Sequence, residues 1–249
     1  MKDCKPVKTP IELNTKLTKP KKIDEGVMKM YPYQSLIGAL MYLVVTTRPD
    51  IAFAVNFLSQ FNSNYNVEHW KAAKRILRYL KGTSNYGLLY EKNNEELYSL
   101  VDADWGADLN DRRSYSGYAF IISGAAICWE ARKQRTVALS STESEYMAIS
   151  EATKEALYLK AVLDDVSVTS KTIEIFNDNQ SAQKLTESFR YHPRTKHIDI
   201  RYHFIRSNVN DGTIKIKYMP TEEMPADVLT KGLTTEKHVN CLRKLGMKY

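Results

Sequence analysis

Four acidic residues lie at the predicted ends of strands or starts of helices, where side chains can meet at one rim of a sheet. They are Asp102, Glu145, Asp178 and Asp227. α/β proteins usually place their sites at such a rim. Crowded carboxylates raise one another's pKa, and Mg²⁺ or Mn²⁺, which prefer hard oxygen ligands, remove that conflict. The pattern therefore predicts a site for two divalent ions about 3.5–4 Å apart, which would suit phosphodiester hydrolysis.

Each of these acids also has a structural explanation when it is taken alone. Asp102 and Asp178 could cap the turns that follow them, and Asp227 could be a first-turn acid favoured by the helix dipole. The nearby Glu143 is better explained as the last residue of a capping box that begins at Ser140 than as a metal ligand. The combination of order, element and local sequence is what favours a shared site.

Two periodicities divide the chain. Residues 33–90 show a helical pattern, with helices expected over Ser35–Thr46, from Asp50 onward and over Val67–Lys81, and with Gly82 expected as a C′ glycine. After residue 95 the expected elements are strands 97–101, 118–122 and 125–129, a helix 140–163, a strand 172–176, helices 179–187 and 198–209, a strand 214–219 and a helix from Pro225. The order βββ-α-β-α-α-β-α predicts an α/β layer fold.

Residues 95–233 resemble the RNase H domain of Copia-type retroelements. The stretches that carry the likeness are Asp102-Ala-Asp-Trp, Asp111-Arg-Arg-Ser-Tyr-Ser-Gly-Tyr, Ala138-Leu-Ser-Ser-Thr-Glu-Ser-Glu-Tyr-Met-Ala, Asp178-Asn-Gln-Ser-Ala, Lys196-His-Ile-Asp-Ile-Arg-Tyr-His-Phe-Ile-Arg and Ala226-Asp-Val-Leu-Thr-Lys. That family has a five-stranded mixed sheet flanked by helices and an Asp-Glu-Asp-Asp site for two metal ions. The resemblance implies that Asp102, Glu145, Asp178 and Asp227 are catalytic metal ligands. It favours Glu145 over Glu143, because Glu145-Tyr-Met-Ala is similar to the Glu-Leu-x-Ala of other RNases H.

The part before residue 95 resembles the end of the Copia-type reverse transcriptase. Residues 30–92 are expected to form a small helical module like the thumb or connection, after an extended basic tether over 1–29. Residues 234–249 are expected to form a C-terminal helix and tail. The Tyr-x-Asp-Asp polymerase signature is absent from the chain, so no polymerase activity is expected. The resemblance implies that the polymerase palm of a full-length polyprotein is a partner.

Basic and polar side chains near the predicted site are candidates for contact with a nucleic-acid substrate. Cations with interleaved aromatic rings suit backbone phosphates, and amides can reach RNA 2′-hydroxyl groups. Cations on one face of the helix 67–81 could follow a phosphate strand, although a solvated face over an ordinary core is the preferred explanation. The candidates are Lys74, Arg75, Arg78, Arg132, Lys133, Asn179, Gln180, Lys196, His197 and Arg201.

The overall composition agrees with a nucleic-acid partner. Thirty-six Lys and Arg against 29 Asp and Glu leave a net charge of +7, which favours a polyanion. Three widely spaced cysteines predict neither a disulfide framework nor a zinc site. No apolar run reaches the ~20 residues of a membrane span, and no signal peptide is expected. We expect a cytoplasmic location, in retroelement particles, or a nuclear one.

The leading hypothesis is a metal-dependent endoribonuclease that cuts the RNA strand of RNA–DNA hybrids. The alternative is a catalytically inactive, nucleic-acid-binding remnant of a retroelement. A transposase or integrase fits less well, because those enzymes have a late glutamate where Asp227 stands. Met224 and Gly232 depart from the residues common in the family, and both lie close to Asp227.

Overall fold

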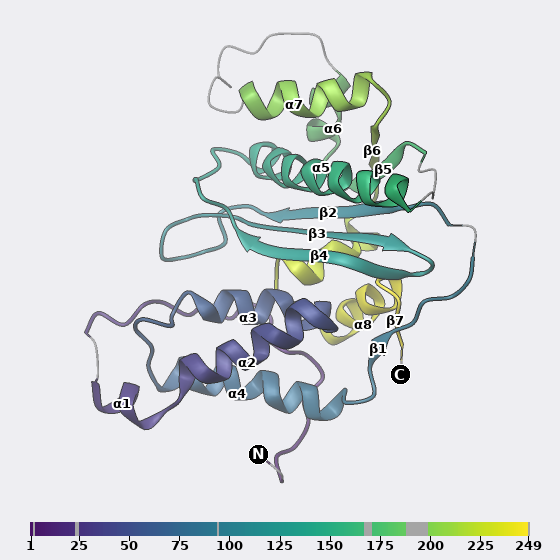
Figure 1. Ribbon diagram of the computed structural model, residues 1–249. Helices are drawn as coiled ribbons and strands as arrows, with labels where there is room; N and C mark the ends of the chain where they lie inside the picture. Colours follow the sequence, from purple (N-terminus) through teal and green to yellow (C-terminus); the bar gives the residue numbers. More distant parts are fainter. Residues whose placement is uncertain (2, 23–24, 94, 167–170, 188–198, 249) are drawn as a thin grey trace.

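A five-stranded mixed sheet lies at the centre of the computed structural model, with helices on both faces (Figure 1). The structure describes residues 1, 3–22, 25–93, 95–166, 171–187 and 199–248. The strands of the sheet are β2 (Tyr98–Asp104), β3 (Tyr115–Ile122), β4 (Ala125–Lys133), β5 (Ile173–Asn177) and β6 (Ile214–Tyr218). Their order is β4-β3-β2-β5-β6; β2, β3 and β4 pair antiparallel, and β5 and β6 run parallel to β2. This RNase H-like topology confirms the predicted fold class.

One face of the sheet is covered by helices that lie between β4 and β6 in the chain. These helices are α5 (Ser141–Asp165), α6 (Gln180–Glu187) and α7 (Asp199–Asn210). Successive side chains of a strand point to opposite faces of a sheet. Val101 and Phe120 accordingly pack with Ile149 of α5, whereas their neighbours Leu100 and Ala119 belong to the core on the other side. Both faces of the central strands β2 and β3 are buried.

The second face is covered by helices from both ends of the chain. They are α2 (Tyr33–Thr46), α3 (Ala52–Ser59), α4 (Val67–Gly82), the 3₁₀ helix η4 (Pro225–Leu229) and α8 (Thr235–Lys244). Leu100 and Ala119 of the sheet share one core with Tyr33 and Ile51 of the amino-terminal helices and with Leu242 of α8. The helical module of residues 30–92 is therefore packed directly against the RNase H-like sheet.

A buried polar network ties these two ends together. The Arg48 guanidinium donates to both oxygens of Asp50, over 2.9 and 2.7 Å. The Tyr79 hydroxyl donates to Asp50 over 2.6 Å and lies 3.0 Å from Nε2 of His238 on α8. Burial of a charged pair is costly unless each partner is hydrogen-bonded, and this network meets that condition.

The remaining elements are short. They are α1 (Glu25–Met30), the 3₁₀ helices η1 (Pro49–Ile51) and η3 (Thr221–Glu223), and the two-residue strands β1 (Gly87–Leu88) and β7 (Met247–Lys248). β1 and β7 pair antiparallel, which brings the end of the helical module next to the carboxyl terminus (Figure 1).

The structure differs from the sequence prediction at three places. Gly82 belongs to α4, with Thr83 as the C-cap, and is not a C′ glycine. A Cβ atom on Gly82 would lie 2.9 Å from Cβ of Pro6, so the glycine is needed for close approach of the amino-terminal segment. The predicted tether over 1–29 contains the helix α1. The helix expected from Pro225 is a 3₁₀ helix of five residues.

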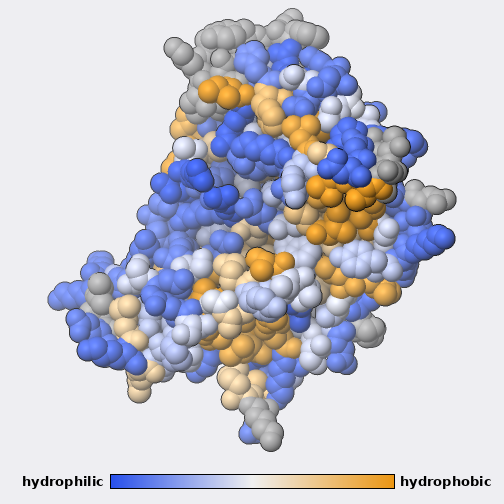
Figure 2. Space-filling model, viewed as in Figure 1, coloured by the Kyte–Doolittle hydropathy of each residue, from blue (hydrophilic) through white to orange (hydrophobic). Residues whose placement is uncertain are grey.

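The surface of the molecule is mixed in character. Figure 2 shows a largely hydrophilic face on which hydrophobic residues gather in separate patches. Tyr42 and Val45 are the exposed large apolar residues of α2. No helix in the described ranges combines the length and apolar composition that a membrane span needs.

Candidate metal centre

Asp102 and Asp178 are brought together by the pairing of β2 with β5. Val101 and Asn177 are register partners in these parallel strands. Asp102 follows Val101 within β2, and Asp178 comes directly after the end of β5. Because parallel strands run in the same direction, the residues after a register pair lie on the same rim of the sheet. The two aspartates therefore meet at the carboxyl-terminal end of these strands.

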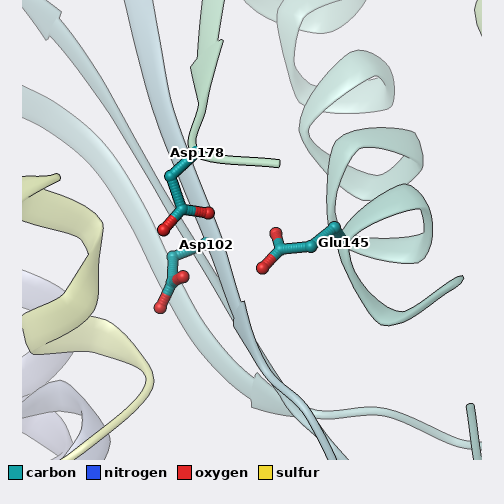
Figure 3. Close-up of side chains that lie close together, drawn as sticks. All are labelled: Asp102, Glu145 and Asp178. Carbon is teal, nitrogen blue, oxygen red and sulfur yellow. The ribbon is translucent and has the colours of Figure 1, made fainter. Parts of the chain in front are cut away.

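Glu145 reaches the same point from the amino-terminal part of α5. Ser140 is the N-cap of this helix, and its hydroxyl accepts a hydrogen bond from the Glu143 amide over 3.1 Å. Figure 3 shows that the Glu145 side chain extends from this helix toward the two aspartates. One carboxylate oxygen from each of Asp102, Glu145 and Asp178 lies within 4.8 Å of the others. The structure thus brings together three of the four predicted ligands.

Glu143 has a different role. Its carboxylate accepts a hydrogen bond from the Leu139 amide over 2.8 Å, one residue before the N-cap. Together with the Ser140 contact, this bond satisfies amides that the first turn of α5 cannot pair internally. The predicted capping box is therefore formed only in part: Ser140 caps the Glu143 amide, but Glu143 binds the Leu139 amide in place of the Ser140 amide.

Asp227, the fourth predicted ligand, lies beside Asp102 with a lysine between them. Nζ of Lys231 is 2.9 Å from Oδ1 of Asp227 and 3.2 Å from Oδ2 of Asp102. The ammonium of Lys237, on α8, contacts Oδ2 of Asp227. The Thr230 hydroxyl donates to Oδ2 of Asp102. Asp227 is therefore connected to the other acids through Lys231.

The site carries more negative charge than its surroundings balance. Burial raises the pKa of Asp102 to about 7; Lys231 opposes this rise, and Asp227 adds to it. Burial and the charge of Asp102 raise the pKa of Glu145 well above its usual value, although a hydrogen bond from Asn177 opposes the shift. For Lys231, burial alone would lower the pKa, but Asp102 and Asp227 raise it overall.

These residues fit a divalent cation. Three carboxylates within reach of one ion form the hard-oxygen donor set that Mg²⁺ and Mn²⁺ prefer. Both carboxylate oxygens of Asp227 are buried, and neither accepts a regular hydrogen bond from the residues that the structure describes. Within the described part of the chain, Lys231 and Lys237 form the ion pairs with those oxygens, so the oxygens suit a cation rather than a neutral donor.

Asn179 and Gln180 lie next to Asp178, at the start of α6. The side-chain oxygen of Asn179 accepts a hydrogen bond from the Ala182 amide over 2.9 Å, so it serves the start of the helix. Gln180 is the first residue of α6 and is exposed. The position of Gln180 beside Asp178 is compatible with the predicted substrate contact.

Three of the predicted cations border a cavity of about 200 Å³ on the α5 side of the sheet. Arg132, Lys133 and Arg201 line it. Arg201 pairs with Glu151 at 2.7 Å, and Lys133 pairs with Asp108 at 2.7 Å. Arg132 pairs with Glu130 at the longer distance of 3.4 Å. Their contact with a substrate stays a prediction, and Lys196 and His197 lie outside the described residues.

The cationic face of α4 is in contact with the amino-terminal segment. Arg75 forms an ion pair with Glu12 at 2.6 Å, and Nε of Arg78 donates to the Lys5 carbonyl over 2.8 Å. Lys74 lies over the ring of Trp70 at 5.9 Å. Two of the three predicted phosphate contacts therefore already bind groups of the same chain.

Four residues around the carboxylates were missed in the sequence. They are Asn177, Thr230, Lys231 and Lys237. Lys231 follows Asp227 by four residues, a spacing that often forms ion pairs on helices, and this signal could have identified it. Asn177 directly precedes Asp178, and this position was a signal for it. Lys237 reaches the site only through tertiary contacts, and nothing in its local sequence indicates it.

Nearly the whole chain is similar in sequence to known proteins. No family model matches it. It is 44% identical over 251 residues to the retrovirus-related Pol polyprotein from transposon TNT 1-94 of Nicotiana tabacum, which covers 99% of this chain and 19% of that protein. It is 37% identical to the corresponding polyprotein from transposon RE2 of Arabidopsis thaliana, over 99% of this chain and 17% of that protein. The chain thus spans about a fifth of the length of these curated relatives.

A solved structure supports the fold. The foamy viral protease-reverse transcriptase dRH in complex with ds DNA aligns with a TM-score of 0.52 and 18% identity, over 82% of this chain and 33% of that chain. Similarity at this level of identity concerns the fold alone. Taken with the near-complete match to transposon polyproteins, it leads to one assignment. The chain belongs to the Pol polyproteins of Copia-type retrotransposons and has an RNase H-like fold.

Proposed function

We propose that the protein is a metal-dependent endoribonuclease that cuts the RNA strand of RNA–DNA hybrids. The observation that carries this proposal is the convergence of Asp102, Glu145 and Asp178 within 4.8 Å at the carboxyl-terminal rim of β2 and β5. Asp102 and Glu145 are buried and have raised pKa values, and such acids at the rim of a sheet are typical of catalytic sites.

The acids have distinct tasks in this proposal. Asp102, Glu145 and Asp178 would hold one divalent ion, and Asp102 with Asp227 would hold a second. When bound, such ions supply positive charge that activates a water and offsets the charge at a leaving 3′-oxygen. The chain itself positions the acids: Asn177 donates to Glu145 over 2.8 Å, and Thr221 donates to Asp178 over 2.7 Å.

Selection of a hybrid requires contact with phosphates and with RNA 2′-hydroxyl groups. Gln180 is exposed next to Asp178, and we assign it to the RNA strand near the cleavage point. The net charge of +7 favours binding of the duplex backbone. Polymerase activity is not part of the proposal, because the chain lacks the Tyr-x-Asp-Asp signature. A polymerase palm elsewhere in a longer polyprotein is the partner we propose.

Cleavage of a defined hybrid tests this function. A hybrid with a 5′-labelled RNA strand is incubated with the protein and Mg²⁺, beside a DNA duplex of the same sequence and a reaction with EDTA. We expect RNA fragments ending in 3′-hydroxyl groups from the hybrid with Mg²⁺ only. Asp178→Asn serves as the matched inactive control. Hybrid binding without any cleavage would instead favour an inactive nucleic-acid-binding remnant.

A further inference from the structure

Lys231 occupies the space between two acids that the proposed function assigns to a metal ion. Its ammonium is 3.2 Å from Oδ2 of Asp102 and 2.9 Å from Oδ1 of Asp227. Both carboxylates are almost fully buried, whereas about a third of the lysine side chain is exposed, 31%. The lysine therefore supplies local positive charge to both acids and can still leave toward solvent.

A divalent ion bound by both acids would need the same position. An ion that bridges Asp102 and Asp227 has to approach oxygens on which Lys231 now lies. Two cations at hydrogen-bonding distance from the same oxygens repel each other strongly in a site of low dielectric. The lysine and that ion consequently exclude one another. An ion held by Asp102, Glu145 and Asp178 competes less with the lysine. In the described structure Lys231 contacts neither Glu145 nor Asp178.

We propose that the Lys231 ammonium is a placeholder for the second divalent ion, pairing Asp102 with Asp227 until that ion displaces it. This inference rests on the proposed function. It makes metal binding sequential: the first ion binds the three clustered acids, and the second binds more weakly because it must expel the lysine. The lysine also prevents the two buried carboxylates from repelling each other in the metal-free protein.

Lys237 offers a matched control. It contacts the other oxygen of Asp227 and donates to the Thr221 carbonyl over 3.0 Å. No contact between Lys237 and Asp102 is found in the described structure, so it does not bridge the two acids. Loss of Lys237 removes one positive charge from the same neighbourhood but leaves the placeholder in position.

Mn²⁺ binding to the metal-free protein tests the proposal. Electron paramagnetic resonance counts free Mn²⁺ during titrations of the wild type, Lys231→Met and Lys237→Met. We expect one tight and one weak ion in the wild type. Lys231→Met should strengthen the weak ion by roughly tenfold or more, the scale of effects seen for residues that support metal ligands. Its effect on the tight ion should be small. Lys237→Met, which removes a cation from the other oxygen of Asp227 only, should strengthen the weak ion less than Lys231→Met does.

Thermal unfolding provides a second readout. Lys231→Met should lower the Tm of the metal-free protein, because Asp102 and Asp227 lose their shared cation, and Mn²⁺ should raise its Tm more than that of the wild type. Lys231→Arg keeps the charge and should behave like the wild type in both measurements.

The outcomes separate the placeholder from the proposed function. An unchanged weak ion in folded Lys231→Met, or an equal gain in Lys237→Met, overturns the placeholder while the metal site stands. If neither the wild type nor Lys231→Met binds Mn²⁺, the proposed metal site itself is wrong and the placeholder falls with it.

Discussion

The side-chain amide of Asn177 donates a 2.8 Å hydrogen bond to Oε2 of Glu145. Asn177 is the last residue of β5 and almost completely buried, and its own oxygen accepts from the Asn179 amide over 3.0 Å. This bond joins the helix that carries Glu145 to the strand that precedes Asp178. It fixes the orientation of one acid relative to another.

Asn177→Asp should lower the metal affinity of the site without changing the shape of the side chain. The variant keeps the shape and the acceptor for Asn179, but it replaces a donor to Glu145 with a negative charge. We expect Mn²⁺ affinity to fall by about 10- to 100-fold and the rise of activity with pH to move to higher pH. Calorimetric titration and a pH–rate profile measure both effects. A lower Tm with an unmoved profile would mean that Asn177 is only structural.

Neutralising a central acid should abolish hybrid cleavage. Asp102→Asn or Asp178→Asn preserves shape but removes a charge from the set that holds the cations. A loss of several kcal/mol of transition-state stabilisation corresponds to at least ~10²-fold in rate. Single-turnover cleavage of the labelled hybrid measures it, with circular dichroism to verify folding. Wild-type rates in either variant would exclude these residues from the site.

Substitutions of Glu145 and Glu143 should affect different properties, cleavage in the first case and capping of α5 in the second. Glu145→Gln is expected to eliminate cleavage and to keep the fold. Glu143→Gln should retain cleavage and cost less than ~1 kcal/mol of stability, because glutamine also serves in a capping box. Parallel cleavage assays and urea unfolding compare them. The opposite pattern of activities would assign the ligand role to Glu143.

Glu145→Gln should also stabilise the metal-free protein at alkaline pH. The pKa of Glu145 is raised in the folded state by burial and by Asp102. The wild type therefore keeps its full stability below the pKa that Glu145 has in the unfolded chain. It loses stability as the pH rises above that value. The variant avoids this loss, so its Tm advantage should be present at pH 8 and shrink toward pH 5. Each kcal/mol corresponds to about 2–4 °C for a chain of this size. Scanning calorimetry in EDTA measures the difference, and saturating Mg²⁺ should reduce it.

His238 should make the protein sensitive to acid. Burial lowers its pKa to about 4 from an ordinary value of 6.5, with a smaller opposing effect of Asp50. Because the unfolded chain takes up the proton first, the stability is complete above pH 6.5 and is lost as pH falls toward 4. At pH 5 the loss is roughly 2 kcal/mol.

A substitution isolates this contribution. His238→Gln should lose less stability than the wild type between pH 7 and pH 5, whatever its stability at pH 7. Urea unfolding at the two pH values gives the comparison. Equal losses in both proteins would show that His238 does not cause the acid sensitivity.

Local sequence determined most elements of this protein. Short β-rich runs bounded by polar or glycine-containing turns identified the strands, and β2 and β3 are buried on both faces. The capping residues around Ser140 located the start of α5 and distinguished Glu143 from Glu145, since these bonds depend only on neighbouring residues. Similarity to Copia-type sequences then identified the order of the acids and the mixed sheet.

Only the tertiary structure determined which residues from distant segments contact one another. Gly82 is expected just after a helix, yet it is the last residue of α4, where the approach of Pro6 leaves no room for a side chain. Lys237 meets Asp227 only because α8 packs beside η4, and Arg75 is paired because the amino-terminal segment returns to α4. Such contacts depend on packing between residues far apart in the chain, and no local pattern encodes them. The bridge that Lys231 makes between Asp102 and Asp227 therefore became visible only when the strand and the 3₁₀ helix came together.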